Sequence, residues 1–281
     1  MAIDLQVVFK SGYICLMGHW VERVALQMSS SVPERALNQR RKRDGYPYHI
    51  TIANAQQTAQ AMRSARSLRI MNEIAAASSL PVNLGLGMVQ NAQNESRSWY
   101  CVISWPAGQQ IRRCFSLLPQ DLHLTLGFDH KDIHIHKGPS TLLTHNIAAA
   151  SLNREQIEGL IYAALLESYT SKDGSLKSLT LALAQAKLIQ DEYLISSAEN
   201  NLIRVQRGER LKEIEGPTDY QLLEDLPQRT VTSVADITVK LESLQMAQKQ
   251  RPSNYLVPEI SERRAMTNVI RKLETLEVDL K

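Results

Sequence analysis

The stretch "GYPYHITIAN", residues 45–54, decides how the first half of the chain is arranged. In it His49 and Thr51 stand two residues apart, with isoleucines between and after them. A second stretch, "LPQDLHLTLGF", repeats the pattern around His123 and Thr125, with leucines in the apolar positions. Residues two apart point to the same side of a β-strand. Each stretch therefore predicts a strand with one apolar face and an opposite face that carries a histidine and a threonine.

Two such strands side by side would bring two imidazoles and two hydroxyls to one site. A neutral imidazole can accept a proton and a protonated one can donate it, since the ordinary histidine pKa is about 6.5. Threonine hydroxyls can donate hydrogen bonds to the non-bridging oxygens of a phosphate group. These groups suit metal-independent cleavage of a phosphodiester, and the sequence shows no acidic cluster for a metal ion. The alternative is that both pairs are solvent-facing strand positions without a shared role.

The segments "YHITI" and "LHLTLGF" resemble the two signature motifs of the two-histidine (2H) phosphoesterase superfamily. That group includes RNA 2′,3′-cyclic phosphodiesterases of the LigT type, cyclic nucleotide phosphodiesterases and 2′-5′ oligoadenylate phosphodiesterases. The resemblance covers roughly residues 1–145. It implies a bilobal fold in which antiparallel sheets surround a central cleft.

The resemblance also implies roles for individual residues. His49, Thr51, His123 and Thr125 would be catalytic, and in the family the first histidine is more often the acid and the second the base. Family members usually have a substantial helix before the second motif, whereas here only the segment 106–120 is available. A shortened second lobe and a more open cleft are therefore expected.

The hydrophobic patterning divides the chain into two parts. Residues 1–148 predict an α+β catalytic domain, and residues 149–281 predict an all-α C-terminal domain. Strands are expected at 4–9, 13–18, 48–53, 82–90, 98–106, 122–128 and 132–138, a helix within 53–79, and either a helix or a strand at 109–118. C-terminal helices are expected at 152–170, 175–215 (as one helix or two), 234–250 and 258–280. The helical part shows no chemistry of its own and is expected to be structural or to dock a partner.

Several residues near the motifs are candidates for binding substrate. Tyr46, Tyr48 and Trp105 could stack against a base, although core packing is favoured for any single ring. Arg43 belongs to a cationic run before the first motif, which predicts either a solvated loop or a cationic rim that attracts a polyanion. His134 alternates with another histidine in "DIHIHKG", and a place near the cleft is favoured over a metal site.

Two adjacent arginines precede the second motif. Arg112 and Arg113 can help to neutralise a phosphate, and a solvated turn explains them equally well.

Composition limits the class of protein. The net charge of +3 is mild, and 43 % hydrophobic with 22 % charged residues is typical of a globular protein. No apolar run reaches about 18 residues, so no membrane segment is expected. Cys15, Cys101 and Cys114 fit neither a disulfide framework nor a zinc site. A cytoplasmic location is expected, with the nucleus as the alternative.

These observations give one leading hypothesis. The chain would be a hydrolase acting on a cyclic phosphate or phosphodiester of a nucleotide or RNA end, without a cofactor, in RNA processing or repair. Conversion of a 2′,3′-cyclic phosphate to a 2′-phosphate is favoured. The alternatives are an RNA- or nucleotide-binding scaffold with a residual phosphate cleft, and 2′-5′ phosphodiesterase or ligase activity. The expected partners are such a nucleotide or RNA and a protein bound by the helical half.

Overall fold

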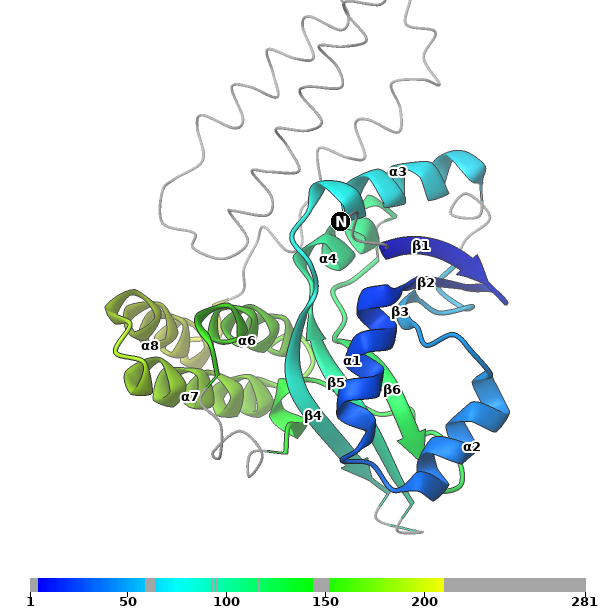
Figure 1. The fold of residues 1–281 in the computed structure, drawn as a ribbon. Coiled ribbons are helices and arrows are strands. Elements are labelled where there is room, and N and C mark those ends of the chain that lie inside the picture. Colours follow the sequence, from blue (N-terminus) through cyan, green and yellow to red (C-terminus); the bar gives the residue numbers. More distant parts are fainter. Residues whose placement is uncertain are drawn as a thin grey trace, which may run out of the picture.

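A computed structural model describes residues 5–58, 64–91, 93, 96–115, 117–143 and 152–209 of the chain (Figure 1). The strands in these residues are β1 (Leu5–Lys10), β2 (Tyr13–Gly18), β3 (Ile50–Ala53), β4 (Val82–Gln90), β5 (Arg97–Ser104) and β6 (Leu122–Phe128). They form one antiparallel sheet in the order β1-β2-β3-β6-β5-β4. Each strand lies where the alternation of side chains predicted one. Together with the helices, the sheet confirms the α+β class.

The sheet has two halves that meet where β3 lies beside β6. One half consists of β1, β2 and β3, and the other of β6, β5 and β4. At this seam Ile50 pairs with Leu124, and both side chains are completely buried. The two sheets that were expected around a cleft are therefore joined into a single sheet, because backbone pairing of β3 with β6 leaves no gap between them.

The prediction of a strand at 132–138 is wrong. This segment contains no strand residues. The backbone N–H of Ile133 donates to the side-chain oxygen of Ser98 at 2.9 Å instead of to a neighbouring strand. Charged side chains of the segment form ion pairs. The alternation of histidines thus reflects a loop held by side-chain contacts.

Helices α1 (His19–Ser29), α2 (Glu34–Asp44), α3 (Ala65–Ala77) and α4 (Pro106–Cys114) pack on one face of the sheet. Val21, Met71 and Ile111 from these helices lie in the main hydrophobic core together with Ile50 and Leu124. α3 confirms the helix predicted in this region, and α4 shows that the ambiguous segment is helical. This apolar core fixes which face of β3 and β6 is left for the polar motif residues.

The sequence pattern did not predict α1 or α2. The cationic run at 40–43, one reading of which was a solvated loop, lies in the last turns of α2. The buried face of this helix is narrow and consists of Ala36 and Arg40. α2 lies so close to β6 that a Cβ on Gly127 would come within 2.7 Å of the carbonyl carbon of Ala36. A helix that packs through so few side chains shows little apolar periodicity in its sequence.

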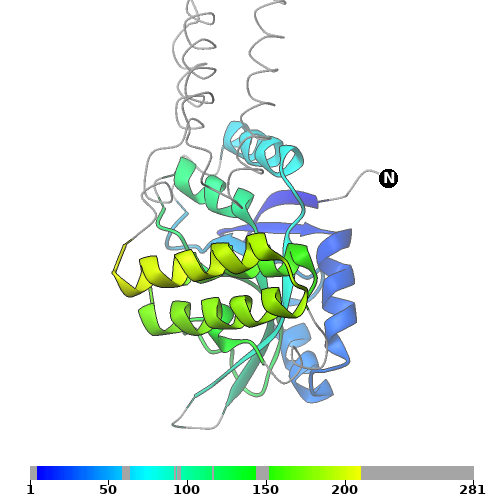
Figure 2. The same ribbon diagram turned by 90° about the vertical axis from the view of Figure 1, so that its left-hand side faces the viewer.

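Helices α6 (Arg154–Glu167), α7 (Lys172–Leu188) and α8 (Glu192–Gln206) form a bundle beside β4 and β5 (Figures 1 and 2). Leu84, Tyr100 and Val102 from the sheet join α6 in a second core. Since neighbours of Tyr100 and Val102 along β5 face the main core, this bundle covers the opposite face of the sheet. Within the described residues, the helical run predicted after residue 174 consists of two helices, α7 and α8.

The division of the chain after residue 148 stays a prediction. The helices predicted at 234–250 and 258–280 lie outside the described residues. Within the ranges that the structure describes, no helix combines the length and apolar character that crossing a membrane requires. The three cysteines are buried and have free thiols.

Candidate active site

The pairing of β3 with β6 brings the two histidine–threonine motifs together. The registered pair at the seam joins the residues that lie between histidine and threonine in each motif. Extending this antiparallel register by one residue on each side puts Thr51 opposite His123 and His49 opposite Thr125. Directly opposite residues have Cβ atoms about 4.5–5.5 Å apart. The four side chains therefore form a quadrilateral, with the histidines on one diagonal and the threonines on the other.

The motif side chains point away from the main core. All four are partly exposed, whereas the alternating apolar residues are each 0 % exposed: Ile50, Ile52, Leu124 and Leu126. The predicted separation of a polar and an apolar face is confirmed. A ligand can reach the quadrilateral from solvent because its side chains are not sealed in the core.

The turn that leads into His49 is held in place by α1 and α2. Arg40 is only 1 % exposed and donates to two carbonyl oxygens of this turn, at 2.7 and 3.4 Å. Its guanidinium carbon lies 3.8 Å from the centre of the Tyr48 ring. The backbone N–H of Tyr48 donates to the carboxylate of Glu22 on α1 at 2.5 Å. These contacts fix the backbone on the N-terminal side of His49.

Arg112 of α4 connects the two motif segments from the core side. It donates to the carbonyl oxygen of Ile52 in β3 at 2.5 Å and to that of Leu118 before β6 at 2.9 and 2.7 Å. Burial lowers the pKa of Arg112 to about 10. The suggestion that Arg112 neutralises a phosphate is wrong, because this guanidinium is buried and its donors are used by the backbone.

Both motif histidines are neutral at neutral pH. Burial is the largest cause that lowers the pKa of His49, to about 4, and the charge of Lys10 is the next. Burial also lowers the pKa of His123, to about 3, and it is followed by the charge of Lys137. A charge on His49 would lower the pKa of His123 further. The two imidazoles are thus electrostatically coupled and lie among cations.

Tyr100 of β5 forms a wall beside the second histidine. Its ring centre lies 5.6 Å from that of His123, with 65° between the ring planes. The phenol donates to the hydroxyl of Thr141 at 2.6 Å. Gly87 on β4 makes room for this ring, since a Cβ there would come within 2.6 Å of it. The sequence analysis missed Tyr100, although alternation along β5 places it on the motif face opposite Thr125.

A chain of charges links α2 to the loop after β6. Asp132 lies 3.1 Å from a guanidinium nitrogen of Arg43 and 2.7 Å from Nζ of Lys137. Burial alone would raise the pKa of Asp132, but Lys137 and Arg43 hold it at about 2. Arg43 also binds Asp44 at 2.6 Å. The charge of Arg43 is therefore shared between two carboxylates, and its role in binding substrate stays a prediction.

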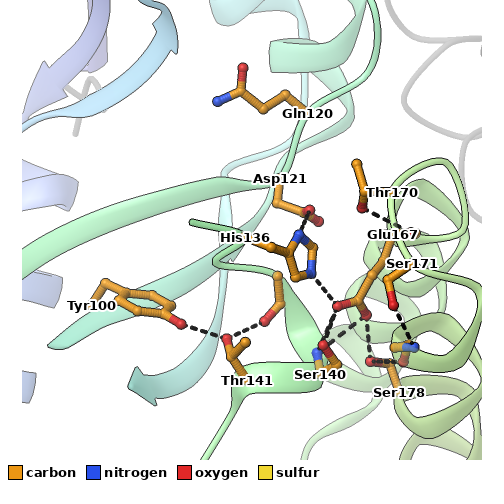
Figure 3. A network of polar contacts seen from close by, with 12 residues as sticks. Tyr100, Gln120, Asp121, His136, Ser140, Thr141, Glu167, Thr170, Ser171 and Ser178 are labelled. Atoms are coloured by element: carbon orange, nitrogen blue, oxygen red, sulfur yellow. Dashed lines mark hydrogen bonds and ion pairs between the residues drawn. The ribbon is translucent and has the colours of Figure 1, made fainter. Parts of the chain in front are cut away.

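His136 lies in a separate network that reaches the C-terminal helices (Figure 3). Its Nδ1 is 3.1 Å from Asp121 and its Nε2 is 2.5 Å from Glu167. Glu167 is completely buried and also accepts hydrogen bonds from the hydroxyls of Ser140 and Ser178. Hydrogen bonds to Asp121 and Glu167 raise the pKa of His136 to about 10. This imidazolium joins the start of β6 to α6 and α7.

The other predicted binding residues differ in their exposure and in whether they lie near the site. Tyr46 is 61 % exposed and meets the Tyr48 ring edge-on, with 6.1 Å between centroids. Tyr48 is 6 % exposed and Trp105 is 1 % exposed, in the main core. Trp105 is therefore not brought to the site. His134 is exposed, and its charge acts on His123, so it lies near the quadrilateral.

The described side chains of the site suit an anionic ligand. They are imidazoles and hydroxyls with cations close by. Among the residues that the structure describes, no group of three or more histidine, cysteine, aspartate or glutamate side chains is arranged to hold a metal ion.

The chain was compared with known protein families. The family model described as Swiss Army Knife, 2H phosphoesterase domain, matches residues 12–134. The matched segment starts in the turn after β1 and ends beyond β6, so it contains both motifs and the seam. No curated protein and no solved structure gave a match.

Proposed function

Residues 12–134 belong to the 2H phosphoesterase superfamily, and we propose that they form the core of an enzyme that hydrolyses a cyclic phosphate or phosphodiester of a nucleotide or RNA end. Hydrolysis of a 2′,3′-cyclic phosphate to a 2′-phosphate is the favoured reaction. One observation carries the proposal. It is the pairing of Ile50 in β3 with Leu124 in β6, because the histidine and threonine that flank each of these residues are all partly exposed.

Each group of the quadrilateral has a role in this reaction. His123 accepts a proton from water as the water oxygen bonds to phosphorus. The P–O3′ bond breaks, and protonated His49 donates its proton to the departing O3′. Thr51 and Thr125 donate hydrogen bonds to the non-bridging oxygens, where negative charge increases in the transition state. After product release His123 gives its proton to solvent, and His49 takes up a proton again when the next phosphate binds.

The assignment of acid and base follows the family resemblance. Burial is the largest cause that lowers the pKa of both histidines. A phosphate in the quadrilateral adds negative charge beside both imidazoles, which raises the pKa of each. The substrate itself would therefore help to protonate His49, the acid.

A chelator-treated assay tests the proposal. The full chain is incubated in EDTA with a panel of 2′,3′-cyclic mononucleotides and with a short RNA that ends in a cyclic phosphate. The His49→Ala/His123→Ala double variant is the control. We expect turnover that persists in EDTA and disappears in the double variant. The position of phosphate in the product, identified by ³¹P NMR, shows which oxygen leaves.

Absence of turnover on every substrate, with binding still measurable, would overturn the proposal. The quadrilateral would then belong to a nucleotide- or RNA-binding module. We further propose that the C-terminal helices position a substrate or a protein partner, because α6 packs on the same face of the sheet as the motif residues.

A further inference from the structure

Lys10, the last residue of β1, lies on the same face of the sheet as the motif side chains. Val8 pairs with Cys15, and Cys15 pairs with Thr51, so residues 8 and 10 of β1 project to the side of Thr51. The ammonium nitrogen of Lys10 is buried and has no hydrogen-bond partner within the described residues. A buried cation without a partner is costly to the folded state. The position is therefore one where a ligand with negative charge would be stabilising.

The surroundings of Lys10 point to the same place. The positive charge of Lys10 lowers the pKa of both His49 and Cys15. Nδ1 of His49 is also buried without a hydrogen-bond partner in the described part of the chain. Burial raises the pKa of Cys15 to about 11, so this thiol is neutral and does not compensate Lys10. Two buried nitrogen atoms without hydrogen-bond partners among the described residues thus belong to residues whose charges affect each other.

The described carboxylates around the site are already used by other cations. Asp44 binds Arg43 and Arg40, at 2.6 and 3.5 Å. Asp132 binds Arg43 and Lys137. Lys137, a second lysine near the site, differs from Lys10 because it is buried together with the carboxylate of Asp132, with which it forms an ion pair.

We propose that Lys10 binds a non-bridging oxygen of the substrate phosphoryl group and, together with the motif residues, completes an anion site that extends from β6 across β3 and β2 to β1. This inference rests on the proposed function, because it assigns a further substrate-binding residue to the same site. Lys10 lies just outside the segment that the family comparison matches, residues 12–134. The chemical class of ligand is a phosphate monoester or diester.

Binding of phosphate at Lys10 would also change the state of His49. The charged groups that act on His49 are Lys10 from β1, Asp44, Arg40 and Arg43 from α2, and His123 from β6. Of the lysine and arginine groups in this set, Lys10 has the largest effect on His49. An anion that pairs with Lys10 offsets this charge and favours the protonated imidazole of His49. Lys10 therefore adds to the effect of burial, which is the larger cause, in keeping His49 neutral until the phosphate arrives.

The test uses inorganic phosphate and the full chain. Phosphate affinity is measured by calorimetry, and the protonation of His49 is followed by ¹⁵N NMR of the imidazole with and without saturating phosphate. The variants are Lys10→Met, the charge-retaining Lys10→Arg, and Lys187→Met as a matched loss of one exposed charge on α7. Thermal unfolding checks that each variant folds.

We expect Lys10→Met to weaken phosphate binding about 10- to 100-fold, as expected for loss of a hydrogen bond to a charged group. In the absence of phosphate, the same variant raises the pKa of His49. With substrate it raises KM more than it lowers kcat. Lys10→Arg recovers most of the affinity, and Lys187→Met behaves as the unmodified protein. Phosphate affinity in Lys10→Met equal to that of the unmodified protein would overturn the proposal.

A second measurement does not depend on a variant. Phosphate should shift the ¹⁵N signal of the Lys10 ammonium group in the unmodified protein, and an unchanged signal at saturation contradicts the proposal. These readouts also separate the two inferences. Loss of phosphate binding in Lys10→Met without hydrolysis of any cyclic phosphate would support Lys10 and refute the hydrolase. Normal hydrolysis with unchanged phosphate affinity in Lys10→Met would support the hydrolase and refute the role of Lys10.

Discussion

The seam between β3 and β6 and the junction between β6 and α6 shift the pKa of histidine in opposite directions. At the seam, burial and neighbouring cations lower the pKa of His49 to about 4 and that of His123 to about 3. At the junction, His136 lies between Asp121 and Glu167, and its pKa is raised to about 10. The protein supplies counter-charges at the junction and leaves cations in excess at the seam.

This difference separates a structural histidine from a candidate functional one. Buried polar groups in proteins are normally paired, and exceptions gather where a ligand binds. At the junction Glu167 follows the rule, since it accepts hydrogen bonds from several side chains, whereas one carboxylate oxygen of Asp121 is buried without a partner in the described part of the chain. The seam departs from it at Nδ1 of His49 and at the ammonium group of Lys10. The predictions below test whether the contrast is one of function or only of packing.

The largest effect is expected from replacing either histidine of the seam. His49→Ala and His123→Ala should each lower kcat by about 10²- to 10⁴-fold, because each removes one partner of the acid–base pair. Both side chains are partly exposed, so the fold should persist, as circular dichroism can show. His130→Ala, in the exposed part of the loop after β6, is the control. Activity within a few-fold of the unmodified protein in both seam variants would exclude the quadrilateral as the site.

The junction should respond in stability before it responds in activity. His136→Ala leaves the buried carboxylate of Glu167 without its cation and should lower the free energy of unfolding by about 3–5 kcal/mol. The partial exposure of the His136 ring places the loss toward the lower end of this range. Urea denaturation measures it, and the double variant His136→Gln/Glu167→Gln should recover much of the stability. An unchanged midpoint in His136→Ala would show that the network contributes little.

Much of the arrangement at the seam could be predicted from the sequence, because alternation in a strand is a local signal. The spacing of His49 and Thr51, and of His123 and Thr125, was enough to place two strands and their polar faces. The local sequence left open whether the two strands are neighbours, and the family resemblance predicted two sheets around a cleft. The structure supplies this pairing through Ile50 and Leu124.

Other parts of the molecule depend on contacts between residues distant in sequence, which a local pattern does not reveal. α2 was missed because its buried face consists of Ala36 and the stem of Arg40. Trp105 was a candidate for stacking against a base, but it is the N-cap residue of α4 and packs in the main core. His136 differs from His134 only in having Asp121 and Glu167 beside it, and Glu167 is brought there by α6.

An intermediate effect is expected from the threonines of the seam. Thr51→Val and Thr125→Val should each lower kcat/KM by about 10- to 100-fold, since each removes one hydrogen bond to a charged phosphate oxygen. Serine at the same positions keeps the hydroxyl and should recover most of the activity. Steady-state kinetics on a 2′,3′-cyclic mononucleotide measures both. Valine variants as active as the serine variants would remove the hydroxyls from the mechanism.

The smallest perturbation is a change of pH, which leaves every side chain in place. NMR of the ligand-free protein should show the imidazoles of His49 and His123 neutral near pH 6 and titrating with midpoints of about 4 and 3, while that of His136 stays protonated until about pH 10. The two regions should then affect stability in opposite directions. The seam histidines have pKa values below the unfolded value of about 6.5, so their contribution is present above that pH and is lost as the pH falls through the folded values. His136 has a pKa above the unfolded value, so its contribution is complete below about pH 6.5 and is lost as the pH rises toward its folded value. His136→Gln should abolish only the loss on the alkaline side, and saturating phosphate should reduce only the loss on the acid side. A phosphate effect on both sides would mean that the seam and the junction respond to the ligand as one unit.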